Sequence, residues 1–143
     1  MKSLRLKGRV LITAVSLLLL AVLGGCSPKV LAPPDLAPEQ QAHIRGSFGG
    51  AVFAGAQLVA IDGETLSSEN AAYILPGTHK VKLQYNRPGG GPPVGPVELQ
   101  FEAEAGHEYI AKWHYSWSNS IYSFSIEDAQ TGSVIVAGGE TSP

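Results

Sequence analysis

The chain has 143 residues with 10 basic and 12 acidic side chains, which give a formal net charge of −2 at neutral pH. This length accommodates one domain, and the single cysteine excludes an internal disulfide. Binding to nucleic acid needs a basic surface that neutralises phosphates, and the body of the chain has no cluster of Lys and Arg. We therefore expect no nucleic-acid partner.

The first 25 residues have the features of an export signal. Four basic residues precede an apolar run over residues 10–23, which only Thr13 and Ser16 interrupt. A membrane-spanning helix needs about 20 apolar residues, whereas this run is shorter and ends in small residues, as a cleavage region does. We predict that residues 1–25 are a cleaved signal peptide, and the alternative is an uncleaved N-terminal anchor.

The sequence Leu23-Gly24-Gly25-Cys26 resembles the lipobox of bacterial lipoproteins, in which an aliphatic residue and two small residues precede a cysteine. In that family the cysteine carries a diacylglycerol, the signal is removed just before it, and many Gram-negative species acylate the new amino group. The resemblance implies that Cys26 is the lipid-attachment site; the alternative is a chance cysteine. Two or three acyl chains anchor a protein stably, whereas one chain is marginal. By the sorting rules of the family, Ser27, which is not Asp, implies passage to the outer membrane.

Residues 26–41 contain four prolines and no apolar period. A proline-rich segment extends by about 3 Å per residue, so we predict that the lipidated Cys26 is followed by a linker that holds the domain some tens of ångströms from the bilayer. Removal of residues 1–25 would leave six basic and twelve acidic side chains, a net charge of −6.

Residues 42–138 consist of short alternating segments separated by turn signals, with no convincing helical period. In one of them, the Pro76-Gly77 corner precedes Val81, Leu83 and Tyr85, which alternate with polar residues. This spacing predicts an all-β fold, an antiparallel sandwich of about seven to eight short strands. The clearest strands are expected near residues 57–62, 79–85, 97–103, 107–116 and 121–127, with weaker ones at 43–48, 70–75 and 133–137.

Two segments outside these strands are expected to be irregular. Residues 87–96 are mostly proline and glycine. We therefore predict a loop in which no strand persists. We predict that residues 139–143 form a disordered tail.

A second resemblance rests on two neighbouring segments. Val59-Ala60-Ile61-Asp62-Gly63 and Leu75-Pro76-Gly77-Thr78-His79-Lys80-Val81-Lys82-Leu83 resemble the small prealbumin-like β-sandwich modules of bacterial envelope proteins, of which the PEGA-type domain is the best known. The match covers about 25 residues. It implies a Greek-key sandwich that binds or scaffolds other molecules and has no catalytic residues.

The histidines are candidate metal ligands. Four histidines could suggest a metal site, but none has a ligand spacing backed by a cysteine or a carboxylate pair. His79 occupies the histidine position of the turn motif, and we interpret it as a hydrogen-bonding residue. We expect no metal and no cofactor. The histidines are His43, His79, His107 and His114.

Acid/base chemistry finds little support in the sequence. Alternation places Glu98 and Glu102 on the solvent face of one strand, where both stay ionised; Glu104 and Glu108 complete this acidic set. The run Gly89-Gly90-Gly91 lacks the Gly-Lys-Ser/Thr of a phosphate-binding loop. The sequence shows no Ser-His-Asp, Cys-His or paired-acid set that could converge, so we predict that the protein is not an enzyme.

Aromatic residues gather in one segment. Alternation places Trp113 and Tyr115 on the same face as Tyr109, and we interpret them as core residues. Trp117 lies in the sequence Ser-Trp-Ser-Asn-Ser, where polar residues favour a turn and a large side chain is less easily buried. We predict that Trp117 contacts a glycan or protein partner. The full cluster is Trp113, His114, Tyr115, Trp117, Tyr122 and Phe124.

These features predict a non-catalytic, lipid-anchored protein of the cell envelope. They favour the outer membrane, facing the periplasm, over the inner membrane, which is the alternative. Its β-sandwich is expected to bind or scaffold another envelope component. The alternative is an accessory protein or a hydrolase that acts on cell-wall or surface polysaccharide.

Replacing Cys26 with Ser should release the protein from the membrane, because the hydroxyl cannot take the place of the acylated thiol. Membrane fractionation and incorporation of labelled fatty acid measure this release. A Cys26→Ser variant that stays membrane-bound and still incorporates fatty acid would contradict the prediction. The Ser27→Asp variant is expected to remain lipidated and to stay at the inner membrane.

Overall fold

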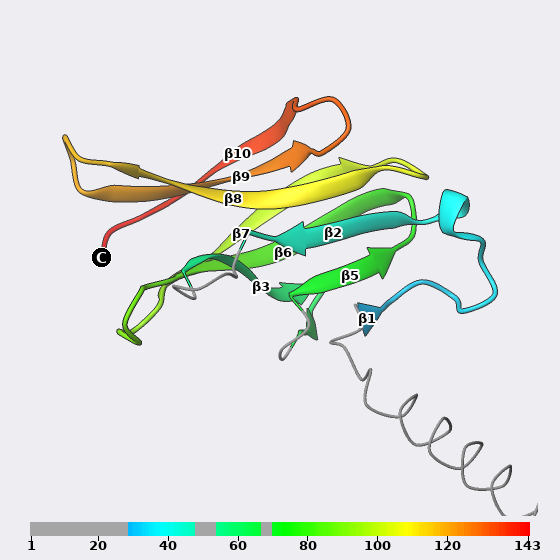
Figure 1. The fold of residues 1–143 in the computed structure, drawn as a ribbon, viewed down its shortest axis with the longest axis horizontal. Coiled ribbons are helices and arrows are strands. Elements are labelled where there is room, and N and C mark those ends of the chain that lie inside the picture. Colours follow the sequence, from blue (N-terminus) through cyan, green and yellow to red (C-terminus); the bar gives the residue numbers. More distant parts are fainter. Residues whose placement is uncertain (1–28, 48–53, 67–69) are drawn as a thin grey trace, which may run out of the picture.

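The computed structural model describes residues 29–47, 54–66 and 70–143, which form two β-sheets packed face to face (Figure 1). The all-β sandwich predicted from the sequence is confirmed. Within these ranges no helix is long and apolar enough to cross a bilayer.

A 3₁₀ turn, η2, spans Pro38–Gln40. The six-stranded sheet has the order β1 (Lys29–Val30), β5 (Ala71–Ile74), β2 (Ala42–Gly46), β8 (Glu108–Ser116), β9 (Ile121–Asp128) and β10 (Val134–Thr141). The four-stranded sheet has the order β4 (Glu64–Thr65), β3 (Gly55–Ile61), β6 (Gly77–Asn86) and β7 (Val94–Ala103).

The strand count is close to the predicted one. The eight segments expected from alternation all form strands, and the structure adds β1 and β4, which have two residues each. Two pairs, β1 with β5 and β2 with β8, are parallel, although the sequence predicted an antiparallel sandwich. Between β2 and β8 the chain passes through the four-stranded sheet, so it can return beside β2 in the same direction.

β7 begins at Val94, inside the segment that was predicted to be a loop. Val94 pairs with Tyr85 and Val97 pairs with Leu83, so β7 has one extra residue between these pairs. This bulge contains Pro96, and β7 is an edge strand, a position where a missing amide hydrogen is tolerated. The predicted absence of a strand is therefore wrong for residues 94–96.

The last strand continues to Thr141, so residues 139–141 do not belong to the predicted disordered tail. Gly139 has a φ of 65° and lies against β7, where an added Cβ would be 2.8 Å from Val97 Cγ2. A glycine is required there for β10 to pass so close to Val97. The packing against β7 explains why the strand extends beyond the segment with clear alternation.

The predicted linker is docked on the domain from residue 29 onward. The backbone amide of Leu31 donates to the Tyr73 carbonyl over 2.9 Å, and Ala32 is buried. Lys29 forms an ion pair with Glu64 at 2.7 Å. These contacts hold the segment against β5 and β4, so the prediction of a free spacer is wrong for residues 29–41. Cys26 and Ser27 lie outside the described residues.

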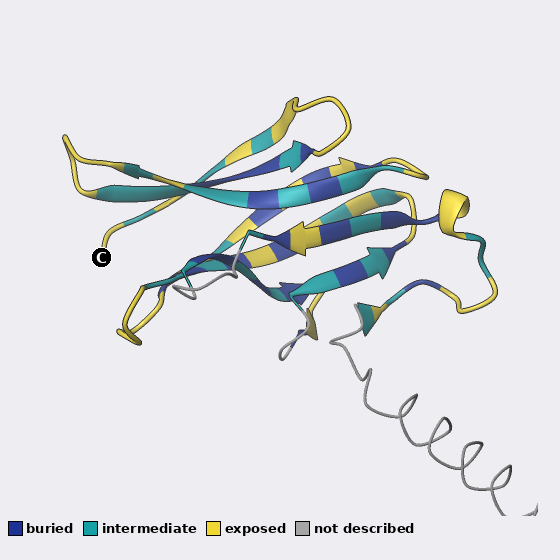
Figure 2. Cartoon of the chain, viewed as in Figure 1, coloured by how far each residue is buried: buried dark blue, intermediate teal, exposed yellow. Residues whose placement is uncertain are grey.

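The core lies between the two sheets, where Figure 2 shows the buried positions along the facing strands. β6 and β7 alternate as predicted: Val81 and Leu83 are fully buried, whereas Lys80 and Lys82 are exposed. Aromatic contact joins the sheets where the Phe101 and Tyr109 rings meet edge to face at 5.1 Å. The largest fully buried side chains are Tyr109, Phe124, Ile44, Leu58, Ile61, Ile74, Leu83, Ile126 and Val81.

Truncating core side chains of the four-stranded sheet should destabilise the protein. Leu83→Ala and Phe101→Ala are each expected to lower the free energy of unfolding by about 2 to 5 kcal/mol, because both remove buried apolar volume. Lys82→Ala, on the exposed face of β6, should lower it by less than about 0.5 kcal/mol. Chemical denaturation measures all three values. Equal effects of Leu83→Ala and Lys82→Ala would contradict the assigned faces.

Candidate binding site at the aromatic end

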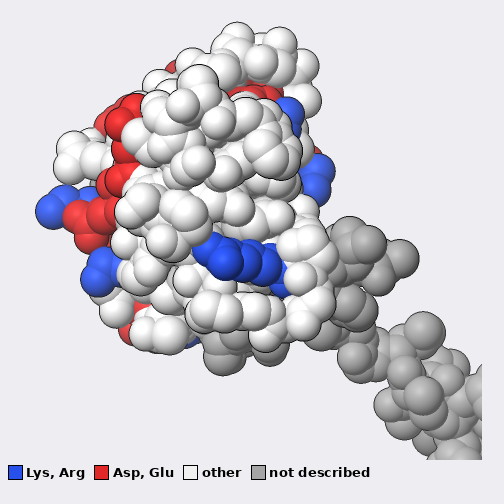
Figure 3. Space-filling view, turned by 90° about the vertical axis from the view of Figure 1, so that its left-hand side faces the viewer, with Lys and Arg blue, Asp and Glu red and all other residues white. Residues whose placement is uncertain are grey.

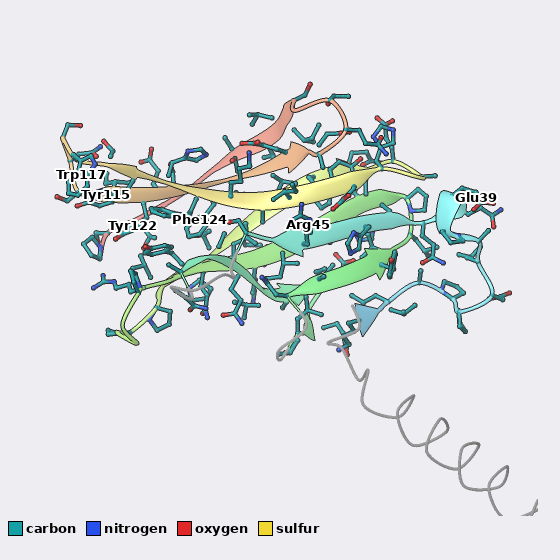
Figure 4. All side chains as sticks on the ribbon, in the orientation of Figure 1. Glu39, Arg45, Tyr115, Trp117, Tyr122 and Phe124 are labelled. Carbon is teal, nitrogen blue, oxygen red and sulfur yellow. The ribbon has the colours of Figure 1, made fainter. Side chains whose placement is uncertain are left out.

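The β8–β9 hairpin extends to one end of the sandwich and carries most of the predicted aromatic cluster (Figure 1). Its strands pair in a register that sets Trp113 opposite Phe124 and Tyr115 opposite Tyr122. Figure 4 shows Tyr115, Trp117 and Tyr122 close together at this end of the hairpin. Cross-strand aromatic pairs of this kind stabilise a hairpin while presenting ring surface on one face.

The rings form a continuous series from the core to the surface. The Tyr85 ring, from β6 of the other sheet, lies 4.2 Å from Trp113 and 5.0 Å from Tyr122 between ring centroids. Tyr122 contacts Tyr115 at 4.7 Å, and Tyr115 meets Trp117 edge to face at 4.8 Å. The inner members of this series pack against the core, whereas its outer end reaches solvent.

These rings line an open hollow of about 550 Å³, which we call the aromatic hollow. The volume lies within the range of about 300 to 1,000 Å³ that is common for small-ligand pockets. Tyrosine hydroxyls, the indole N–H groups and the imidazole of His114 add hydrogen-bonding groups to the ring surface. The residues that line it are Tyr85, Trp113, His114, Tyr115, Trp117 and Tyr122.

Trp117 is 87% exposed in the turn between β8 and β9, as the polar residues around it predicted. Trp113 is half-buried and packs against the core, in agreement with its predicted role. Tyr115 was interpreted as a core residue, but it is only half-buried and lines the aromatic hollow. It lies beyond the end of β2, where β8 has no described neighbour on that side to cover it.

Electrostatics at the aromatic hollow come from its tyrosines and from Arg87. Burial raises the pKa of the Tyr85 hydroxyl, and the nearby Tyr122 adds to the rise, while the charge of Arg87 acts in the opposite direction. Arg87 follows Tyr85 by two residues and begins the loop to β7. Figure 3 shows this end of the molecule as a mostly uncharged surface with a basic strip near its middle and a group of acidic side chains along one flank.

The two histidines that follow turns have structural partners. His79 Nδ1 lies 2.6 Å from Asp62 Oδ2, and His79 Nε2 lies 2.7 Å from the Leu75 carbonyl oxygen. His79 therefore links the turns around residues 62 and 75, the loop-bonding role that the sequence indicated. His107 Nδ1 donates to Asp128 Oδ2 over 2.6 Å, and this bond is the main cause that holds the pKa of Asp128 below its usual value.

The other two histidines lie apart from these pairs. His43 packs on Tyr73 with ring centroids 4.7 Å apart, and burial lowers the pKa of His43. His114 Nε2 lies 3.0 Å from the Ser125 hydroxyl. In the part of the chain that the structure describes, no group of three or more His, Cys, Asp or Glu side chains is placed to hold a metal ion.

The acidic residues considered from the sequence are distributed along exposed strands. Glu98 is 3.7 Å from Lys80, and Glu102 accepts a hydrogen bond from Thr78. Glu108 is paired with Arg45 at 2.7 Å, and Glu104 lies at the β7–β8 turn. Gly89, Gly90 and Gly91 lie in an exposed loop. The aromatic hollow includes none of these residues.

Tyr85, which belongs to the site, and Arg87, which follows it by two residues, were not recognised from the sequence. Tyr85 was assigned to the core by its alternation with Val81 and Leu83, and it is buried, yet it also forms one wall of the aromatic hollow. Arg87 lies in the segment that was predicted to be a loop. No pattern in the sequence links Tyr85 to the β8–β9 hairpin.

The two tryptophans should differ in their contribution to stability. Trp113→Ala is expected to lower the free energy of unfolding by about 2 to 4 kcal/mol, because it removes a ring packed between the sheets. Trp117→Ala should leave the melting temperature within a few degrees, because its ring is exposed. Thermal denaturation of both variants measures the difference. Similar losses in both variants, or protection of all tryptophan fluorescence from iodide, would contradict the placement of Trp117.

Comparison of the chain with protein-family models, with curated proteins and with solved structures returned no match. The site itself is defined by six lining residues from β6, β8, β9 and the β8–β9 turn. Its chemistry is that of aromatic faces and hydrogen-bonding groups, and the charge of Arg87 acts on the Tyr85 wall.

Proposed function

We propose that the protein is a non-catalytic, lipid-anchored component of the cell envelope that binds another envelope component through the aromatic hollow. The observation that supports binding most directly is the exposure of Trp117 at the outer end of the ring series. The exposed tryptophan leaves a large apolar side chain in contact with water beside an open hollow. Tryptophan is also strongly enriched among the residues that dominate binding energy.

The lipid anchor belongs to the proposal through the lipobox-like sequence at residues 23–26. Only Ser27 and Pro28 separate Cys26 from the docked Lys29, and three residues of chain span at most about 11 Å. A lipid on Cys26 would therefore keep the β1 region close to the bilayer. Figure 1 shows the β8–β9 turn at the other end of the sandwich from β1, so the aromatic hollow would be displayed away from that contact.

Hydrolysis of a polysaccharide, the alternative considered from the sequence, has less support. Glycoside hydrolysis commonly uses two carboxyl groups about 5 to 10 Å apart on either side of the scissile bond. The residues that line the aromatic hollow include no carboxylate. The composition of the hollow therefore favours recognition over cleavage.

A photo-reactive amino acid can test the proposed binding end in living cells. We expect that a benzoylphenylalanine at position 118, next to Trp117, forms a discrete adduct with an envelope component in the full chain. The matched control at position 131 lies in the exposed β9–β10 turn and should form no such adduct. Adding Trp117→Ala should abolish the adduct from position 118.

The same experiment has two results that would overturn the proposal. One is the absence of an adduct from position 118 in correctly localised protein. The other is an adduct that persists at full yield in the Trp117→Ala background, since binding would then not depend on the aromatic hollow.

A further inference from the structure

We infer that the ligand of the aromatic hollow is a glycan that carries carboxylate groups, with the rings of the hollow contacting sugar faces and Arg87 contacting a carboxylate. This inference deepens the proposed function and rests on the same site. Two independent features support it. One is the shape and composition of the ring surface, and the other is the unpaired charge of Arg87.

The ring surface suits pyranose rings. A sugar ring has polar edges and faces formed by C–H groups, whose positive ends are attracted to the negative face of an aromatic ring. Tyr115 and Trp117 lie at the open end of the hollow, where a face can be covered by a ligand ring. His114 and the tyrosine hydroxyls offer hydrogen bonds to hydroxyl groups at the sugar edge.

A protein partner fits the surroundings of Trp117 less well. A stable protein interface buries about 800 Å² on each partner and has an apolar centre. Among the described residues, the other exposed large apolar side chains lie elsewhere: Val30 and Leu75 beside β1 and β5, and Val134 and Ile135 at the start of β10. Among the described residues, Trp117 therefore lines a small aromatic hollow and does not lie within a broad apolar surface.

Arg87 is the second feature. Of the six Lys and Arg side chains that the structure describes, four form ion pairs, and only Lys82 and Arg87 do not. The Nε of Arg87 is buried and has no hydrogen-bond partner. Because this Nε is closed to solvent, a ligand carboxylate would bind the outer nitrogens of the guanidinium, which take part in no ion pair of the described residues, through charge-assisted bonds.

The charge of Arg87 also discriminates between ligand classes. A quaternary ammonium, which aromatic cages bind, would be repelled by a cation that is close enough to Tyr85 to act on its hydroxyl. A nucleic-acid strand stacks on aromatic residues but needs a basic groove along its phosphates, and one unpaired arginine does not supply it. An acidic glycan matches both the ring surface and the positive charge.

The inference can be tested with the full chain, purified in a polyoxyethylene detergent that contains no sugar. Tetragalacturonate serves as the acidic probe and chitotetraose as the neutral one, with binding followed by calorimetry and tryptophan fluorescence. At low salt we expect tetragalacturonate to bind at least about tenfold more tightly than chitotetraose. This advantage should shrink at 0.5 M salt, at which an exposed charge pair is strongly screened, as expected from a Debye length of roughly 3 to 10 Å.

Three variants assign the contacts. Trp117→Ala should weaken binding of both probes by at least about tenfold, whereas Arg87→Gln should remove only the preference for the acidic probe. Lys82→Gln is the matched control, because Lys82 is the other described cation without an ion pair and lies on the exposed face of β6. It should leave both affinities unchanged, and melting curves verify that each variant is folded.

The inference is overturned if neither oligosaccharide binds the folded wild type, if Trp117→Ala leaves both affinities unchanged, or if Arg87→Gln keeps the acidic preference. A proline-rich decapeptide provides the comparison with a peptide ligand. Its binding at the hollow without binding of either glycan would overturn the inference while leaving the proposed binding end intact. In contrast, if the photo-reactive residue at position 118 forms no adduct, the proposed function itself is overturned.

Discussion

The parallel pairing of β2 with β8 is the contact that holds the six-stranded sheet together. β2 joins β1 and β5 on one side to β8, β9 and β10 on the other. It places Ile44 beside Tyr109, two buried residues that lie 65 positions apart in the chain. The loss of chain entropy that accompanies such a distant contact is offset by the apolar area that both sheets bury between them.

The same pairing explains why the aromatic hollow exists. β2 covers only residues 108–111 of β8 and ends at Gly46, where an added Cβ would lie 2.4 Å from the Ala56 carbonyl oxygen. The rest of β8 pairs with β9 on one side and, within the described residues, has no strand on the other. Tyr85 from the opposite sheet contacts the inner rings there. Among the described residues no further strand covers the outer rings, and these rings are open.

Alternation in the sequence was sufficient to predict β6, β7 and β8, because each has one face in the core and one in water. It could not predict the parallel pairs or the docking of residues 29–41, since these depend on contacts between distant segments such as Leu31 with Tyr73. The exposure of Trp117 followed from its polar neighbours. The contact of Tyr85 with Trp113 and Tyr122 did not, because it joins two different sheets and no local pattern encodes how the sheets pack.

Docking of the N-terminal segment changes what a lipid on Cys26 would do. A free linker would let the sandwich rotate and move through a large volume. The aromatic hollow would then have no fixed position relative to the bilayer. With Lys29 paired to Glu64 and Leu31 bonded to Tyr73, only Ser27 and Pro28 separate Cys26 from the docked segment. The orientation of the sandwich at a bilayer would then be restricted by its own fold. A hollow at the end remote from β1 would face outward from the membrane, which suits recognition of an extended polymer parallel to the bilayer better than recognition of a lipid headgroup.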